Sequence, residues 1–236
     1  MVLKDNGWLQ VALTSVHILL TVVIVVKGVE EGIEKWIGNL MPVFVVLLAV
    51  LLVRSMGLPS ASRGFQFLFY PDFAKLSSSS LLHAIGHVCF TLSIGFGTMV
   101  TFGSYLKENT HIPSAAFRVT TMDTAISLVA GLLIFPLVLG GAFQFSGPEV
   151  LFQTLPRLLQ SSGAGSLFGL AFFACVYVAA LGASIGLLES VVANLTDLKI
   201  FRRRRASWFA GGVSLAMAIV PALSTSVFRN FSFMGL

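Results

Sequence analysis

The sequence predicts an all-α polytopic membrane protein with about six transmembrane helices, forming a single transmembrane domain over residues 1–236. Hydrophobic residues make up 56% of the chain and charged residues only 11%, whereas roughly a quarter of the residues of soluble domains are charged. Apolar runs of 18 residues or more recur along the chain, and about 20 such residues cross the hydrocarbon core of a bilayer. The composition leaves no room for a sizeable soluble domain.

The predicted spans follow the apolar runs in chain order. They are residues 8–26, 36–53, 80–106, 113–142, 166–195 and 207–227. The fourth and fifth exceed the thickness of a bilayer, so we expect them to tilt, kink or protrude. Pro136 supplies a kink in the fourth span.

Lysine and arginine in the connections predict the orientation. The larger set lies in the shorter connections, and it consists of Lys27, Lys35, Lys107, Arg118, Lys199 and Arg202–Arg205. Because cytoplasmic loops are enriched in these residues, this side is placed in the cytoplasm, and both chain ends lie outside. An outside N-terminus without an earlier span is unusual, and it is a first indication of a fragment. Arg202–Arg205 is interpreted as an anchor at lipid headgroups and not as a nucleic-acid site.

The third span combines features that a plain lipid-facing helix does not need. It carries His87, Thr91 and Ser93 together with Gly86, Gly95 and Gly97. Secondary transporters use discontinuous helices at the membrane midplane, where unwound backbone binds ions and substrate. The sequence therefore predicts a broken helix near Thr91–Gly97. The alternative is a continuous helix whose small residues allow close packing.

Two carboxylates lie inside predicted spans. Asp123 marks an ion or proton path by default, and Ser127 follows one helical turn later. Alternatively, Asp123 lies near the cytoplasmic end and is neutralised by Arg118. Glu189 is interpreted as a structural partner more than as a ligand. No Walker, zinc-protease or nucleophile-elbow motif is present in the sequence, so no enzyme is expected.

Several motifs in order resemble the neurotransmitter:sodium symporter family, in its bacterial type. The string Gly86–Gly97 resembles the sixth helix of that family. Segments 27–35, 67–73 and 220–224 resemble its loop between helices four and five, its loop before helix six, and part of helix nine. The resemblance implies that the spans are helices four to nine of an inverted-repeat fold, with helices one to three and those from ten onward absent.

The resemblance also implies roles for individual residues. The implied substrate-binding residues are Phe90, Ser93, Phe96, Ala183 and Leu187; the sodium ligands are Thr91 and Asp123; a weak second sodium site uses the carbonyl of Ala179; and the chloride site involves His87, Thr91 and Ser127.

Two departures from the family pattern carry hypotheses. Asp123 stands where the family usually has Asn, and its charge is hypothesised to replace that of chloride. Gly182 and Ala183 stand where the family supplies two hydroxyls to the second sodium. That site is therefore expected to be weakened, displaced towards Ser184 or lost. The apolar wall at Ala183 and Leu187 favours an apolar or neutral amino acid.

The implied function is sodium-coupled symport of amino acids or related small amines by alternating access, in the bacterial inner (plasma) membrane. Sodium is the expected ion, with chloride as a second candidate. The expected partners are an amino-acid substrate, the lipid bilayer and a separate chain that supplies the missing helices; no nucleic acid is expected. The alternatives are a non-transporting subunit or an inactive remnant of a split gene, and a proton-coupled transporter with Asp123 or Glu189 as carrier.

Overall fold

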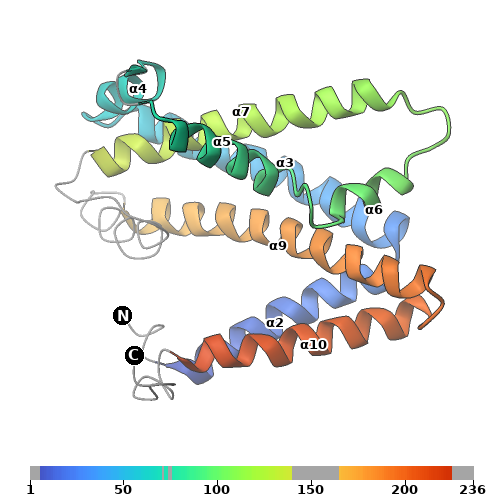
Figure 1. Ribbon diagram of the computed structural model, residues 1–236. Coiled ribbons are helices and arrows are strands. Elements are labelled where there is room, and N and C mark those ends of the chain that lie inside the picture. The colour runs from blue at the N-terminus through green and yellow to red at the C-terminus, as the bar shows by residue number, and fades with distance from the viewer. Residues whose placement is uncertain (1–5, 71, 74–75, 140–164, 225–236) are drawn as a thin grey trace. The chain divides into compact units, whose positions relative to one another are not determined.

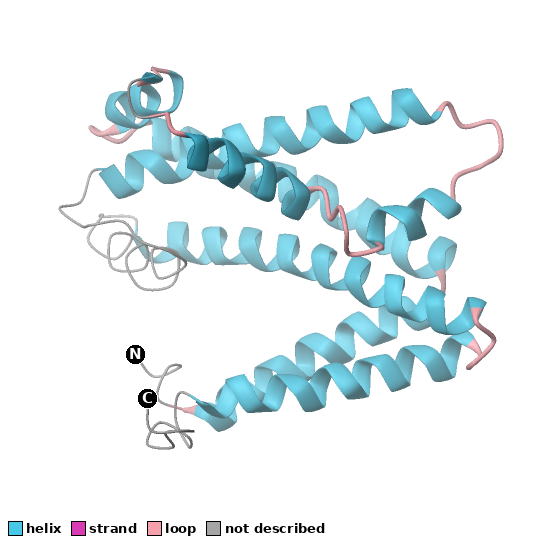
Figure 2. Ribbon diagram, viewed as in Figure 1, coloured by secondary structure: helices cyan, strands magenta, loops and turns pink. Residues whose placement is uncertain are grey.

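The computed structural model describes residues 6–70, 72–73, 76–139 and 165–224, and all regular structure within these ranges is helical (Figures 1 and 2). The helices are α2 (Gly7–Val26), a π-helical segment η1 (Val29–Glu34), α3 (Lys35–Met56), α4 (Ala61–Phe69), α5 (Ser78–Thr91), α6 (Thr98–Ser104), α7 (Ile112–Leu139), α9 (Gly165–Asp197) and α10 (Arg203–Ser224). They divide into two compact units, each described by itself below. Unit 1 contains Met1–Asn39, Val100–Phe102 and Ala180–Leu236, and unit 2 contains Leu40–Met99 and Gly103–Ala179.

Five helices among the described residues are long and apolar enough to cross a membrane. They are Gly7–Val26, Val29–Met56, Ile112–Leu139, Leu167–Asp197 and Arg203–Leu223. Each coincides with a predicted span. Residues 140–142 and 225–227 of the predicted spans lie outside the described residues.

The third predicted span consists of two helices instead of one. Helix α5 begins at a capping box, in which the Ser77 hydroxyl accepts from the N–H of Ser80 and the Ser80 hydroxyl accepts from the N–H of Ser77. It ends at Thr91, and α6 begins only at Thr98. The predicted break is therefore confirmed, and it explains why five long helices are found where six spans were predicted.

One predicted boundary is corrected by the structure, and one connection contains a short helix. Helix α10 begins at Arg203, four residues before the predicted start of the last span, and Arg203 donates to the carboxylate of Glu189 on α9. The connection between the second and third predicted spans contains α4. This helix is short and carries Arg63 and Gln66 among its aromatic residues, so its apolar content did not mark it as a span.

In unit 1, α2 and α10 run side by side (Figure 1). Their approach depends on Gly211, because a Cβ atom at this position would lie 2.2 Å from the Cγ2 of Val22. In unit 2, the core joins α3, α7 and α9. Its buried members are Leu51, Leu133, Leu137, Val138, Phe172 and Cys175.

Pro136 lies inside α7, where its missing N–H leaves the carbonyl of Leu132 without a helical partner. Ser55, at the end of α3, donates its hydroxyl to the carbonyl of Leu133 at 2.8 Å and lies 3.5 Å from that of Leu132. Ser60, before α4, donates to the carbonyl of Pro136 at 2.6 Å. Two serines thus hold the connection between α3 and α4 against this end of α7.

Candidate functional site

The break between α5 and α6 leaves backbone groups without helical partners. The last turn of α5 closes with hydrogen bonds from the N–H groups of Leu92, Ser93 and Ile94 to the carbonyls of Val88, Phe90 and Cys89. Within the described part of the chain, the N–H groups of residues 95–97 donate no hydrogen bond. The backbone here takes positive φ angles, 53° at Ser93, 95° at Gly95 and 77° at Gly97. Glycine adopts such angles without steric cost, so two of these three positions suit their residue.

One predicted ligand pair comes together at this break. The hydroxyl of Thr91, the last residue of α5, lies 3.3 Å from Oδ2 of Asp123 on α7. The same hydroxyl lies 3.3 Å from the carbonyl of Val88. Oxygen ligands held at 2.3–2.6 Å from a cation, as around calcium, lie about 3.3–3.7 Å apart when they meet at right angles. The spacing of these oxygens thus suits a small hard cation.

Three predicted substrate-binding residues also gather at the break. Phe90 precedes it and Phe96 lies within it, and their rings meet edge to face at 6.0 Å. Their side chains are 71% and 54% exposed in this chain. Ser93 lies between them, at the first positive φ angle. The break therefore presents two aromatic faces beside free backbone donors.

The predicted chloride residues are not joined by contacts. Ser127 follows Asp123 by one turn of α7, and His87 lies one turn before Thr91 on α5. Both side chains are exposed, and neither forms a hydrogen bond or ion pair with a described residue. Within the described ranges, Thr91 is the one member of the predicted chloride set that contacts a charged group, the carboxylate of Asp123.

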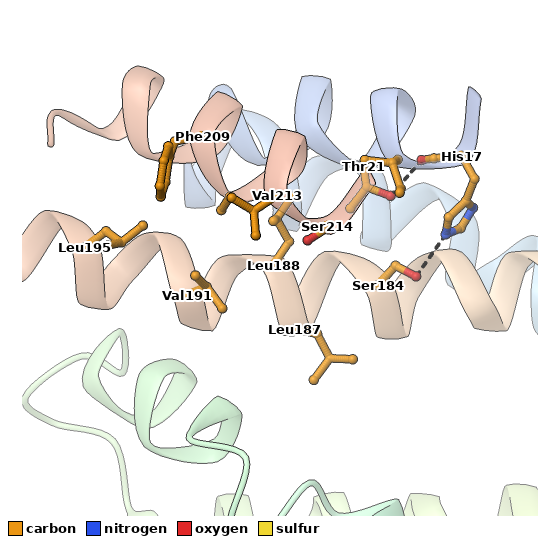
Figure 3. A pocket seen from close by; sticks show the side chains of 12 residues that line it. His17, Thr21, Ser184, Leu187, Leu188, Val191, Leu195, Phe209, Val213 and Ser214 are labelled. Carbon is orange, nitrogen blue, oxygen red and sulfur yellow. Dashed lines mark hydrogen bonds between the residues drawn. The ribbon is translucent and has the colours of Figure 1, made fainter. Parts of the chain in front are cut away.

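Unit 1 holds a separate pocket of about 480 Å³ between α2, α9 and α10 (Figure 3). Leu187, a predicted substrate residue, lies at its edge; Ala183 does not line it. In the pocket, Nε2 of His17 and the hydroxyl of Ser184 are 2.9 Å apart, and Ser184 also donates to the carbonyl of Ala180 at 2.9 Å. The Ser184 hydroxyl is thus engaged on the α2 side of α9. Ala179, which supplies the predicted carbonyl of the second sodium site, lies on α9 in unit 2.

Glu189 forms the buried ion pair of unit 1. Its side chain is 0% exposed, and both carboxylate oxygens accept from Arg203, at 3.0 and 2.6 Å. Arg203 also donates from Nε and Nη2 to the carbonyl of Val25, at the end of α2. These contacts match the structural role that the sequence favoured for Glu189. The sequence did not predict Arg203 as the partner of Glu189, because Arg203 was interpreted together with the rest of Arg202–Arg205 as a lipid anchor. The short connection between α9 and α10 was the signal that Glu189 and Arg203 could form a contact.

Comparison with known proteins identifies the fold. The profile of the sodium:neurotransmitter symporter family matches residues 2–227. The chain belongs to that family. It is 34% identical to the uncharacterized sodium-dependent transporter YhdH of Bacillus subtilis over 98% of this chain and 51% of the relative. An uncharacterized sodium-dependent transporter of Haemophilus influenzae is 31% identical over 94% of this chain and 49% of the relative.

A solved structure shares the fold of this chain. The crystal structure of MhsT in complex with L-phenylalanine matches with a TM-score of 0.85 and 34% identity, covering 99% of this chain and 54% of MhsT. This chain thus spans about half the length of the relatives it matches. Family membership and the five apolar helices make it a multi-pass membrane protein, and bacterial relatives agree with a location in the bacterial inner membrane. Both bacterial relatives are named as sodium-dependent transporters.

Proposed function

We propose that this chain serves sodium-coupled symport of amino acids or related small amines across the plasma membrane, by alternating access. The observation that carries the proposal is the break between α5 and α6, with the Thr91 hydroxyl 3.3 Å from the Asp123 carboxylate at its edge. Broken helices of this kind bind ions and substrate in secondary transporters, and a helix bundle then rocks around the bound pair. Sodium binding favours the conformation that accepts substrate, which couples the two fluxes.

Thr91 and Asp123 are proposed to hold sodium, supplying a hydroxyl and a carboxylate oxygen. Both are hard oxygen ligands, and the carboxylate adds the charge that attracts a cation. Sodium dependence in the names of the relatives supports this assignment.

The proposed substrate contacts at the break are Phe90, Ser93 and Phe96. Ala183 and Leu187, on the part of α9 that belongs to unit 1, are proposed as substrate residues from the resemblance to the family alone. Free backbone N–H groups beside the aromatic rings suit the carboxylate of an amino acid, and the rings suit an apolar side chain. The L-phenylalanine bound by MhsT supports an amino-acid substrate.

Asp123 is proposed to replace the charge of chloride. A fixed carboxylate beside sodium makes a bound anion at Ser127 and His87 unnecessary. Exchanging chloride for gluconate in an uptake assay tests this, with unchanged uptake expected. A steep loss of uptake would show that the site with His87, Thr91 and Ser127 still requires chloride.

The second sodium site is proposed to be weakened or lost. Gly182 and Ala183 have no hydroxyl, and the hydroxyl of Ser184 is engaged by His17 and Ala180, so only the carbonyl of Ala179 remains from this helix. The expected result is a sodium activation curve with a Hill coefficient near one. A Hill coefficient near two would show that the second sodium site is retained.

The second candidate function is that of a non-transporting membrane subunit, or of a remnant of a split gene. The chain spans about half the length of the relatives it matches, so the activity of those whole relatives is a proposal for this chain. A reading frame directly upstream that encodes three spans, the first broken and rich in glycine, would indicate a separate chain that completes the transporter.

Uptake of radiolabelled amino acids tests the proposal, with sodium varied, for this chain alone and for the chain co-expressed with its upstream neighbour. Sodium-dependent uptake by the completed protein is the expected result. Uptake that ignores sodium and follows pH would favour proton coupling instead, with Asp123 as the carrier, since Glu189 is held by Arg203. No uptake in either arm would favour the subunit or remnant.

A further inference from the structure

The start of α10 gathers positive charge that no described carboxylate neutralises, apart from the pair of Arg203 with Glu189. The exposed cations here are Lys199, Arg202, Arg204 and Arg205, while Arg203 is directed inwards to Glu189. Among the described residues, none of these four side chains forms a hydrogen bond or ion pair. The only carboxylate in this stretch is that of Asp197, which is exposed at the end of α9.

The helical register places part of this charge on the outward face of α10. Arg203, Ala206, Ser207 and Ala210 face inwards and are buried or half-buried. Arg204 and Arg205 lie on the other side, and Trp208, one turn further, is 48% exposed. The two arginines and the indole thus form one short surface.

This surface continues directly into an apolar stripe. Gly212 follows Trp208 by one turn, and a Cβ atom there would meet nothing within 4 Å. Ala216 and Ile219 continue the same face, and both are exposed in this chain. A stripe of this kind, on a helix long enough to cross a membrane, is the face that acyl chains contact.

We propose that Arg204, Arg205 and Trp208 form a binding site for the headgroup of an anionic phospholipid, whose acyl chains lie along Gly212, Ala216 and Ile219. Charge complementarity identifies the occupant. Guanidinium groups bind phosphate oxygens in a bidentate geometry, and tryptophan is enriched at the depth of the headgroups. Lys199 and Arg202 add attraction from the adjoining turn. The continuity with the apolar stripe favours a lipid over a water-soluble phosphate compound, which would leave that stripe without a partner.

The proposal goes beyond an anchoring role for the arginines. A simple anchor requires only net positive charge near the membrane, whereas this site requires the two arginines that share a face with Trp208. Each basic residue near an anionic surface contributes about 1 kcal/mol, or roughly a fivefold change in affinity. Removing both arginines should therefore weaken lipid binding by more than about tenfold.

The test is lipid titration of the purified full chain in a neutral detergent, with bound lipid counted by native mass spectrometry. The probes are phosphatidylglycerol, phosphatidylcholine with the same acyl chains, and sn-glycerol 3-phosphate. The variants are R204Q/R205Q and the matched control R54Q/R63Q, which removes the same charge from exposed positions on α3 and α4. Detergent solution removes the effect of these charges on membrane insertion, and circular dichroism checks that both variants fold.

The expected result is a preference of the native chain for phosphatidylglycerol, which R204Q/R205Q loses and R54Q/R63Q retains. Equal losses in both variants would overturn the proposal, since only net charge would then matter. Equal binding of the two lipids, or binding of glycerol phosphate as tight as that of the anionic lipid, would also overturn it. Should R204Q/R205Q not fold, the single variants R204Q and R205Q are compared with R54Q and R63Q. A larger loss of phosphatidylglycerol preference in the first two variants supports the site, and equal losses in all four contradict it.

Discussion

Asp123 is the residue whose chemistry most distinguishes the candidate ion site. A carboxylate and an amide carry the same oxygen ligand, so Asp123→Asn removes charge while keeping the geometry at Thr91. We expect the variant to need about tenfold more sodium for half-maximal uptake and to become chloride-dependent, because the negative charge beside the cation must then come from an anion. Uptake in chloride and in gluconate, with sodium varied, measures both effects.

The control for this variant is Glu108→Gln, which removes an exposed carboxylate in the connection before α7. It should leave the sodium dependence unchanged. An Asp123→Asn protein that works equally well in gluconate would disprove the role of the Asp123 charge.

The ion pair of Glu189 and Arg203 contributes to the stability of unit 1. Removing one partner of a buried ion pair leaves an uncompensated charge and typically costs 3–5 kcal/mol. Arg203 is 28% exposed and can recover some water, so we expect Glu189→Gln to destabilise unit 1 by about 3 kcal/mol, towards the lower end of that range. Thermal unfolding in detergent, followed by circular dichroism, measures the loss.

The double variant Glu189→Leu/Arg203→Leu removes both charges of the pair, and with them the cost of burying those charges away from water. Because apolar residues can replace a buried pair with little loss, it should unfold at a higher temperature than Glu189→Gln. A double variant that is less stable than the single one would show that the contacts of Arg203 with Val25 matter more than the pair itself.

At the level of elements, the break between α5 and α6 depends on glycine. Gly95 has a φ angle of 95°, so Gly95→Ala should cost about 1–2 kcal/mol and shift the local conformation towards helix. We expect uptake to fall because residues 95–97 then lose their free backbone donors. Gly86→Ala is the matched control: Gly86 lies inside α5 with open space around it, and alanine there should stabilise the helix by up to about 1 kcal/mol.

Thermal unfolding and uptake are measured for both alanine variants. Equal behaviour of the two would mean that the positive φ angle at Gly95 is not needed for transport.

Elements with strong local signals were predicted well from the sequence. Long apolar runs predicted the five membrane helices, and the glycines and hydroxyls of residues 86–97 predicted the break. Helix α4 and the first turn of α10 were missed, because in both cases charged or polar residues were assigned to connections. Arg203 illustrates the reason. A charged residue can lie inside a helix when a residue elsewhere in the fold neutralises its charge, and the periodicity of the local sequence does not reveal that partner.

For the candidate site, the sequence predicted residues better than contacts. Thr91 and Asp123 were paired through the resemblance to the family, and the structure brings them to 3.3 Å. The engagement of Ser184 by His17 was not predicted, because these residues lie 167 positions apart and nothing in their local sequences links them. Roles assigned to Phe90, Ser93, Phe96, Ala183 and Leu187 remain predictions.

On the scale of the whole molecule, the distribution of lysine and arginine predicts an orientation that labelling can test. With Cys89 and Cys175 replaced by alanine, Ser62→Cys on α4 should react with an impermeant maleimide on intact cells. Glu108→Cys should react only after permeabilisation, because its connection lies on the side with more positive charge. Both positions are exposed, so access to the reagent and not burial decides the result. The reverse pattern of labelling would show that the chain has the opposite orientation in the membrane.

The most direct measurement of the central claim is radiolabelled amino-acid uptake into proteoliposomes that contain this chain together with the complementary half. An inward sodium gradient should drive uptake, and Thr91→Ala should abolish the sodium dependence. The control is Thr124→Ala, which should not, because the hydroxyl of Thr124 donates to the carbonyl of Thr120 within α7. Uptake that is equal in sodium and in choline, or that Thr91→Ala leaves unchanged, would contradict a sodium and amino-acid site at the break.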